Sequence, residues 1–302
     1  MCKLKKIDSI EEKIELYQVA KEALSKGQNM VKTLIDRGAS KSDSIEISYE
    51  LQAGEYTRGF NEKSLRRNKE LHKIIDKYLA LDGIDSVGVF GVGEAKNWIG
   101  YEGKIKSLFG VELSFSRLRF AFDNISKLKG INSFQLFKGD ASEVTFANNS
   151  FDLSITLHSI EPNGNEQGAK ILENVINSSS KYIILFEPDF STAHDVMKER
   201  MIKNDYVRNI AEKISKNDSV NVIDCFVTEI QENENNKTTC WILEKVNKVK
   251  LSEMKLVCPY TNDALVNYKE GLYSPQAGLI YSKINDFFLL NKRDAIFIGE
   301  KQ

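Results

Sequence analysis

The stretch of this chain from Ser86 to Glu161 limits the possible folds more than any other part of the sequence. It holds, in order, an apolar segment, a glycine turn, a second apolar segment that ends in an acid, a Gly-Asp pair and a further apolar segment. In a doubly wound parallel sheet, such a turn lets the backbone approach a ligand, and a carboxylate one strand later accepts hydrogen bonds from ribose hydroxyls. The ordered series therefore predicts a sheet that binds a nucleoside.

Short apolar segments alternate with amphipathic segments of helical period along the middle of the chain. The expected strands are Ser86–Phe90, Ser107–Glu112, Ser133–Lys138, Phe151–Thr156, Tyr182–Glu187, Val220–Gln231 and Thr238–Val246. The expected helices are Ala95–Gly103, Ser116–Leu128, Gln167–Asn177 and Ala193–Lys216, the last in one or two pieces. The linker Glu232–Lys237 is too short for a crossover helix, so the last two strands should form a hairpin. The pattern predicts an α/β fold with a Rossmann-like, doubly wound, mostly parallel sheet of seven strands and an antiparallel terminal hairpin.

The pattern divides the chain of 302 residues into three segments. Residues 1–82 form a helical N-terminal extension, with its clearest helix over Glu62–Leu79 and a turn or linker over Gly38–Ser44. Residues 48–60 fit neither a helix nor a strand. Residues 83–248 form the sheet domain, and residues 249–302 form a small α+β unit.

The charge balance and the cysteines restrict the functional class. The chain has 42 basic and 43 acidic residues, which argues against a dedicated nucleic-acid binder. No apolar run is long enough to span a bilayer, and the N-terminus lacks the pattern of a signal peptide. Four scattered cysteines without a CxxC pair fit reduced thiols. We therefore expect a soluble cytoplasmic protein without a membrane partner, and we expect the basic run Arg66–Lys69 to be a solvated helix face.

The glycine turn, Glu112 and the pair Gly139-Asp140 together carry a resemblance to a known family. With the tract Phe146–Asp152, they resemble the class I S-adenosylmethionine-dependent methyltransferases over about residues 84–246. The resemblance implies that S-adenosylmethionine is the cofactor and that the protein is an enzyme that transfers its methyl group. The residues expected at the cofactor are Tyr56, Gly91, Gly93, Glu112, Leu113, Asp140, Ala141 and His158.

The resemblance also implies roles for these residues. Gly91 and Gly93 would let the backbone pass beneath the cofactor, and the following helix would begin there. Glu112 would accept hydrogen bonds from the ribose hydroxyls, and Asp140 from the adenine amino group. The family usually has an acid before the first glycine, where this chain has Val89-Phe90, and Glu94 is the nearest carboxylate that could replace it.

Polar residues at the ends of the fourth and fifth expected strands are the candidates for catalysis. His158 could act as a general base because its unperturbed pKa lies near neutrality, and Glu161 and Glu187 are further candidates. The residues expected at the acceptor are Tyr49, Arg58, Asn163 and Asp189. An aromatic residue such as Tyr56 could cover the sulfonium through cation–π attraction. The Asn/Asp-Pro-Pro-aromatic motif of amino-methylating nucleic-acid enzymes is absent after the fourth strand, which disfavours N-methylation of adenine or glutamine.

The last segment resembles the zinc-ribbon-like unit of the tRNA-methyltransferase activator family. The resemblance rests on Cys258-Pro259, a leucine some residues later and an aromatic turn with glycine. Only Cys258 occupies a cysteine position of that unit, because Ser274-Pro275 stands where a second cysteine is expected. Structural zinc needs four ligands, so the unit is predicted to keep the shape without the metal.

Three functions remain open from the sequence. The leading hypothesis is methyl transfer to a small polar acceptor, such as the hydroxyl or amine of a sugar or nucleotide-sugar. The first alternative is methylation of tRNA or of a translation protein, and the second is a non-catalytic scaffold that binds a nucleoside. The N-terminal helices either close over the cofactor or form the contact of a homodimer.

Overall fold

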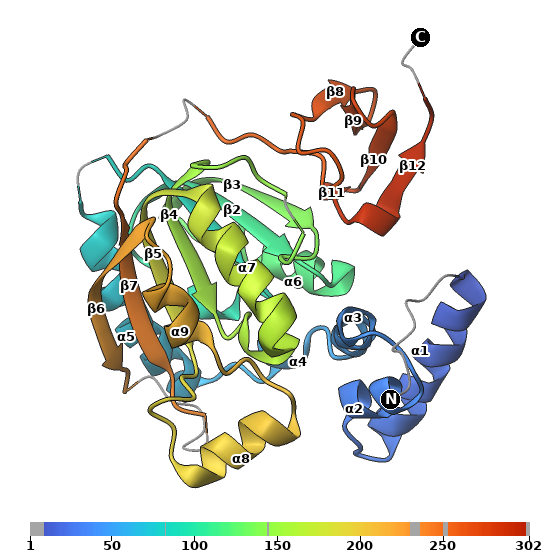
Figure 1. Cartoon of the computed structure of the whole chain (residues 1–302), viewed down its shortest axis with the longest axis horizontal. Coiled ribbons are helices and arrows are strands. Elements are labelled where there is room, and N and C mark those ends of the chain that lie inside the picture. Colours follow the sequence, from blue (N-terminus) through green and yellow to red (C-terminus); the bar gives the residue numbers. More distant parts are fainter. Residues whose placement is uncertain (1–8, 82, 144, 230–235, 250–252, 300–302) are drawn as a thin grey trace.

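The centre of the protein is a β-sheet whose strands lie in the order β6-β7-β5-β4-β1-β2-β3 (Figure 1). The computed structural model describes residues 9–81, 83–143, 145–229, 236–249 and 253–299. The strands are β1 Ser86–Phe90, β2 Ile105–Glu112, β3 Ile131–Lys138, β4 Phe151–Leu157, β5 Ser179–Glu187, β6 Val220–Val227 and β7 Thr239–Lys245. Strands β1 to β5 pair in parallel, whereas β7 runs antiparallel to both β5 and β6. The expected Rossmann-like sheet with an antiparallel terminal hairpin is confirmed.

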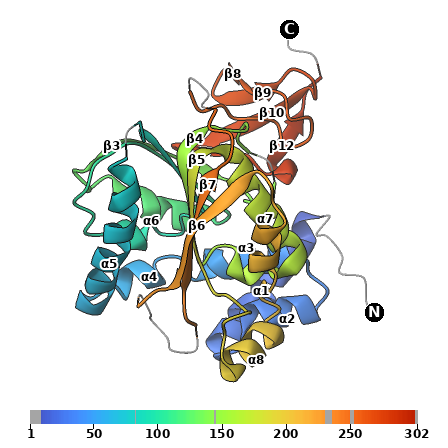
Figure 2. The same cartoon turned by 60° about the vertical axis from the view of Figure 1, so that its left-hand side comes forward.

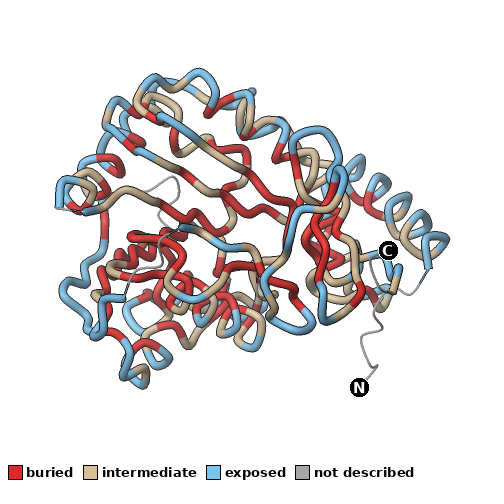
Figure 3. Tube along the Cα trace, turned by 90° about the horizontal axis from the view of Figure 1, so that it is seen from above, coloured by how far each residue is buried: buried red, intermediate tan, exposed pale blue. Residues whose placement is uncertain are grey.

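Helices cover both faces of this sheet. Helices α5 (Glu62–Leu79) and α6 (Phe115–Ile125) lie on one face, and α7 (Gly164–Ser178) and α9 (Ile210–Ser215) lie on the other (Figure 2). Successive side chains of β5 belong to opposite faces, so Ile184 joins the core beneath α5 and α6 while Ile183 joins the core beneath α7. The inner strands β1, β4, β5 and β7 are accordingly almost continuously buried, whereas the edge strand β6 is exposed after Val220, and buried stretches run through the middle of the molecule (Figure 3). Helix α8 (Asp195–Lys203) lies beyond the carboxyl end of β5.

The helix expected over Ala95–Gly103 is wrong, because only a 3₁₀ turn forms there, over Lys96–Trp98. Ala95 has a φ of 54° and Gly100 a φ of 81°, and these left-handed residues interrupt a helix. The aromatic ring of Trp98 instead packs on His72 of α5, with 6.4 Å between the ring centroids. Helix α5, rather than a helix after β1, therefore covers this part of the sheet.

The N-terminal segment contains more helix than the sequence indicated. Its further helices are α1 Ile10–Ser25, α2 Met30–Asp36, α3 Lys41–Leu51 and α4 Glu55–Arg58. The turn expected over Gly38–Ser44 ends early, because the Ser40 side chain accepts a hydrogen bond from the Asp43 amide and begins α3. Residues 48–60 are also partly helical, since α3 continues to Leu51 and α4 follows. No helix among the described residues is long and apolar enough to cross a membrane.

The C-terminal segment extends the central sheet. Its strands are β8 Val266–Tyr268, β9 Gly271–Ser274, β10 Leu279–Ile284, β11 Phe287–Leu289 and β12 Ala295–Phe297. Strand β11 pairs in parallel with β3, with Phe288 opposite Phe137, so the sheet continues into this segment. The division of the chain at residues 82 and 248 stays a prediction.

Cys258 and Ser274, the two positions compared with zinc-ribbon cysteines, are each hydrogen-bonded to another side chain. The Cys258 sulfur lies 3.3 Å from the Tyr281 hydroxyl, and the Ser274 hydroxyl donates to Asp263 over 2.9 Å. Within the described part of the chain, no group of histidine, cysteine or acidic side chains could hold a metal ion. The predicted metal-free state remains a prediction.

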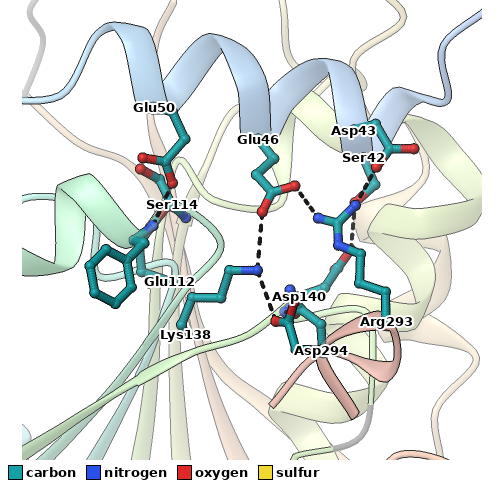
Figure 4. Close-up of polar contacts among 12 residues, drawn as sticks. Ser42, Asp43, Glu46, Glu50, Glu112, Ser114, Lys138, Asp140, Arg293 and Asp294 are labelled. Atoms are coloured by element: carbon teal, nitrogen blue, oxygen red, sulfur yellow. Dashed lines mark hydrogen bonds and ion pairs between the residues drawn. The ribbon is translucent and has the colours of Figure 1, made fainter. Parts of the chain in front are cut away.

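Buried ion pairs join the N-terminal helices, the sheet and the C-terminal segment (Figure 4). Glu46 of α3 is 4% exposed and pairs with Lys13 of α1 at 3.1 Å, with Lys138 of β3 at 3.0 Å and with Arg293. Lys138 also pairs with Asp294 at 2.9 Å. Burial alone would raise the pKa of Glu46, but its cationic partners together hold that pKa below its ordinary value.

Replacement of Glu46 by glutamine should destabilise the fold by about 3 kcal/mol, because it leaves buried cations without their charge partner. A lowered folded-state pKa stabilises the protein above the unfolded-state pKa, and this contribution is lost as the pH falls through the folded value. The wild type should therefore lose more stability on acidification than Glu46→Gln. Thermal unfolding between pH 7 and pH 3 measures both effects.

The matched control is Glu22→Gln, which removes an exposed pair with Lys26. We expect that control to change the free energy of unfolding by less than about 0.5 kcal/mol. Equal losses in the two variants would show that the buried network does not hold the three segments together.

Candidate functional site

A cavity of about 460 Å³ lies at the carboxyl ends of β1 to β4, beneath α3 and α4. Its volume falls within the range of roughly 300–1,000 Å³ found for small-molecule sites. The expected site residues that line it are Tyr49, Tyr56, Gly91, Gly93, Glu112, Leu113, Asp140, Ala141, His158, Glu161 and Asn163. Arg58, Glu187 and Asp189 are not among the described residues that line it. The structure thus brings most of the predicted residues together at one site.

The glycine turn forms the floor of the cavity next to β1. Gly91 has a φ of 72°, and a β-carbon there would lie 2.3 Å from the β-carbon of Ser159. Gly93 has a φ of 59°, but a β-carbon there would meet no atom within 4 Å. Gly91 therefore permits close packing of the loop after β1 against the loop after β4. Gly93 leaves space open above the turn.

Glu112 ends β2 with its carboxylate buried beside this turn. One oxygen accepts from the Gly93 amide at 2.9 Å, and the other accepts from the Ser114 amide at 3.0 Å. Burial raises the pKa of Glu112, and the charge of Arg117 opposes this effect. A carboxylate has about four lone-pair sites, so two remain for a ligand such as a vicinal diol.

Asp140 lies after β3, where three parts of the chain meet (Figure 4). Its carboxylate accepts from the hydroxyl of Ser42 in α3 at 2.7 Å, and from the amide and hydroxyl of Ser142 at 2.9 and 2.7 Å. Its own amide donates to the side-chain oxygen of Asn291 at 2.6 Å. The sheet, the N-terminal helices and the C-terminal segment therefore all fix the position of this carboxylate.

The Glu94 carboxylate connects the glycine turn to the N-terminal helices. It accepts from the amide of Gly54 at 2.8 Å, and from the amide and hydroxyl of Thr57 at 2.7 and 2.6 Å. These bonds hold α4 over the cavity. The proposed replacement of the family acid by Glu94 stays a prediction, and a ligand amine there would compete with these donors.

His158 and Glu161 form a hydrogen-bonded pair at the end of β4. The Nδ1 atom of His158 lies 2.5 Å from a Glu161 oxygen, and its Nε2 atom lies 2.7 Å from the Thr238 hydroxyl. Burial disfavours the charged imidazole, but the hydrogen bond and charge of Glu161, together with the charge of Glu187, raise the pKa of His158 above its ordinary value. A histidine oriented in this way by a carboxylate is suited to proton transfer.

Glu187 and Asp189 lie apart from the cavity lining. The fully buried Glu187 carboxylate accepts from the successive amides of Ser159, Ile160 and Glu161 at 3.0, 3.1 and 3.0 Å. Asp189 accepts from the amide of Ser191 at 2.9 Å. This placement gives Glu187 a positioning role for the loop that carries His158, and it gives Asp189 a role in a local turn.

The sequence did not identify the cationic side chains of the cavity. Arg117 of α6 is 5% exposed, and its guanidinium carbon lies 3.5 Å from the ring centroid of Tyr49 and 5.1 Å from that of Tyr56. Arg67, expected on a solvated helix face, lines the cavity instead. Lys96, Arg200, Tyr206 and Thr238 also line it. Their side chains meet only through tertiary packing, so the local sequence carries no signal for them.

The fold has counterparts among solved structures. A scan against protein-family models and a search of curated proteins gave no match. Magnesium protoporphyrin IX methyltransferase (ChlM) from Synechocystis PCC 6803 with bound SAM is 12% identical and aligns over 68% of this chain and 96% of its own, with a TM-score of 0.51. N-methyltransferase NodS from Bradyrhizobium japonicum WM9 in complex with S-adenosyl-L-homocysteine is 11% identical and aligns over 67% and 98%, with a TM-score of 0.50. The chain therefore has the fold of class I S-adenosylmethionine-dependent methyltransferases.

Alanine substitutions at Gly91 and Gly93 should lower the free energy of unfolding by different amounts. Gly91→Ala combines a left-handed conformation with overlap against Ser159, and it should destabilise the protein by about 3 kcal/mol or more. Gly93→Ala carries only the conformational cost of about 1 kcal/mol. Thermal unfolding measures the difference, and equal losses would contradict the described packing of the turn against Ser159.

Proposed function

We propose that this protein is an S-adenosylmethionine-dependent methyltransferase that acts on a small polar acceptor. The observation that carries the proposal is the placement of Glu112 and Asp140 on neighbouring strands of one cavity, above a glycine turn. The spare lone pairs of Glu112 and the open space above Gly93 fit the ribose and the chain of the cofactor. The fold shared with two solved methyltransferases supports the same assignment.

The reaction would be an in-line displacement. Bound S-adenosylmethionine would supply a methyl group that its sulfonium already activates, so the protein contributes alignment and desolvation. An acceptor oxygen or amine nitrogen would form the new bond to the methyl carbon, while the electrons of the breaking bond return to sulfur. Glu161 would keep the proton on Nδ1 of His158, so that Nε2 can take the proton that the acceptor loses.

The acceptor that we propose is a hydroxyl or amine of a sugar or nucleotide-sugar. The near-neutral charge of the chain supports a free small molecule in the cytoplasm over a nucleic acid or a membrane lipid. Helix α3 contributes Ser42 to the bonds of Asp140, which supports a lid role for the N-terminal helices. A homodimer contact stays a prediction, and α1 has exposed apolar side chains at Ile10 and Ile14.

Calorimetric titration with S-adenosylhomocysteine tests the cofactor site. The wild type should bind in the micromolar range, and Glu112→Ala and Asp140→Ala should each weaken binding at least tenfold, because each removes acceptors for the nucleoside. The control is Glu102→Ala, since Glu102 is exposed and is not among the described cavity residues. Absence of wild-type binding would reject the proposed activity and favour the non-catalytic scaffold.

The proton affinity of His158 is measurable because the chain has only three histidines. In an NMR titration, the pKa of His158 should lie above the ordinary value, whereas burial lowers that of His72. The protonated His158 therefore stabilises the fold below its unfolded-state pKa, and this contribution is lost as the pH rises through the folded value. Glu161→Gln should lower the pKa of His158.

The variant His158→Gln assigns the resonance, and His194→Gln, at an exposed position, is its matched control. Once an acceptor is identified, His158→Gln should reduce kcat by about 10²–10⁴-fold and remove the rise of rate with pH. A pKa of His158 that does not respond to Glu161→Gln would contradict the pairing described above.

A further inference from the structure

Arg117 brings a buried positive charge to the wall of the cavity. The residue is 5% exposed, and its Nε and Nη2 atoms have no hydrogen-bond partner among the described residues. The hydrogens of these two atoms lie on one edge of the planar guanidinium, and such an edge can donate to both oxygens of a carboxylate. Buried donors without partners are costly, so this edge indicates a ligand with a planar anionic group.

Two acids beside the start of α6 use their oxygens for backbone amides and leave this edge of Arg117 free. Glu112 accepts from the amides of Gly93 and Ser114, and Glu50 accepts from the first two amides of α6 (Figure 4). The charge of Arg117 still acts on Glu112, because it opposes the rise that burial causes in the pKa of that carboxyl. The two charges therefore interact, while the Nε and Nη2 donors stay available.

Two tyrosine rings lie against the guanidinium of Arg117. The ring centroid of Tyr49 is 3.5 Å from the guanidinium carbon, a distance that is reached over the face of a ring, and that of Tyr56 is 5.1 Å away. Stacking on a ring uses the flat face of a guanidinium and leaves the donors at its edge. These donors are enclosed in the described conformation. Tyr56 is 46% exposed and lies on the four-residue α4, so we expect its ring to turn outward when a ligand reaches them.

Tyr49 also shows where Arg117 lies along the cavity. Burial raises the pKa of Tyr49, the charge of Arg117 opposes this rise, and the charges of Glu112 and Glu161 add to it. Tyr49 is therefore close to the carboxylate expected at the ribose and to the carboxylate that pairs with His158. Arg117, stacked on the same ring, lies between the nucleoside end of the site and the candidate base.

The glycine turn offers little to the ammonium group of the cofactor. Val89 and Phe90 stand where the family usually has an acid, and both side chains are buried in the hydrophobic cores. The Glu94 carboxylate already accepts from the amides of Gly54 and Thr57 and from the Thr57 hydroxyl. An ammonium at Glu94 would have to displace donors that hold α4 in place.

We propose that Arg117 binds the carboxylate of the amino-acid part of S-adenosylmethionine, and that this chain recognises that end of the cofactor by its carboxylate rather than by its ammonium. The proposal rests on the proposed methyltransferase function and names a specificity-determining residue of its cofactor site. The carboxylate is the one anionic group of S-adenosylmethionine, and its two oxygens match the free edge of the guanidinium. Its binding would also give the buried charge of Arg117 a partner.

Calorimetric titration of the whole chain with three nucleosides tests the proposal. They are S-adenosylhomocysteine, S-adenosyl-3-thiopropylamine, which lacks only the carboxylate, and S-adenosyl-4-thiobutyrate, which lacks only the amine. Loss of the carboxylate should raise the wild-type Kd at least about tenfold, and loss of the amine should raise it less than about threefold. Arg117→Gln should raise the Kd of S-adenosylhomocysteine at least about tenfold and change that of S-adenosyl-3-thiopropylamine less than about threefold.

The comparison of the two ligands separates binding of the carboxylate from a structural role of Arg117. If Arg117 only held Tyr49 in place or adjusted the charge of Glu112, its loss would weaken both ligands equally, because both contain the same nucleoside. The matched control is Arg119→Gln on the same helix, since Arg119 is exposed and is not among the described cavity residues. We expect that control to change each Kd less than about twofold.

Two results would overturn the proposal while the cofactor site stands. One is an equal weakening of both ligands in Arg117→Gln, and the other is a wild type that loses more affinity without the amine than without the carboxylate. The second result needs no variant, so the test holds even where Arg117→Gln does not fold. Absence of S-adenosylhomocysteine binding to the wild type would reject the proposed function and the role of Arg117 with it.

Discussion

The loops around the cavity depend on buried carboxylates that accept hydrogen bonds from backbone amides. Glu187 satisfies three successive amides after β4, and Glu94 satisfies two amides around α4. Glu50 of α3 does the same for the first amides of α6, at 2.6 and 3.1 Å. Backbone donors that no helix or strand satisfies are costly when buried, so each carboxylate fixes the path of a loop.

Side chains from three segments of the chain build the site together. Asp140 bonds to Ser42 of the N-terminal helices and to Asn291 of the C-terminal segment. Glu46 of α3 pairs with Lys138 of β3 and with Arg293, so buried charges also join the N-terminal helices to the sheet and to the C-terminal segment. Because β11 also extends the sheet beside β3, the C-terminal segment supports the strand that presents Asp140. The adenine side of the proposed cofactor site therefore depends on contacts outside the sheet domain.

The sequence predicted those parts of the protein that depend on the pattern of neighbouring residues. The order of strands and the positions of Glu112 and Asp140 follow from apolar segments that end in an acid, and helix α5 was predicted to the residue. The helix after β1 could not be predicted, because Ala95 takes a left-handed conformation that its side chain does not indicate. Arg67 and Arg117 were missed for a different reason, since packing of α3 to α5 decides whether a helical arginine meets solvent or a cavity.

The same bonds reduce the negative charge that the acids present to the cavity. Glu187 is fully buried and accepts from three successive amides, and Glu161 accepts from His158. These donors offset part of the charge of each carboxylate, so the number of acids at the ends of β4 and β5 overstates the negative potential there. Arg117 adds a positive charge to the cavity wall, against the rings of Tyr49 and Tyr56. The charge that a ligand meets is therefore set by the bonds that each side chain makes within the fold, which the residue types alone do not give.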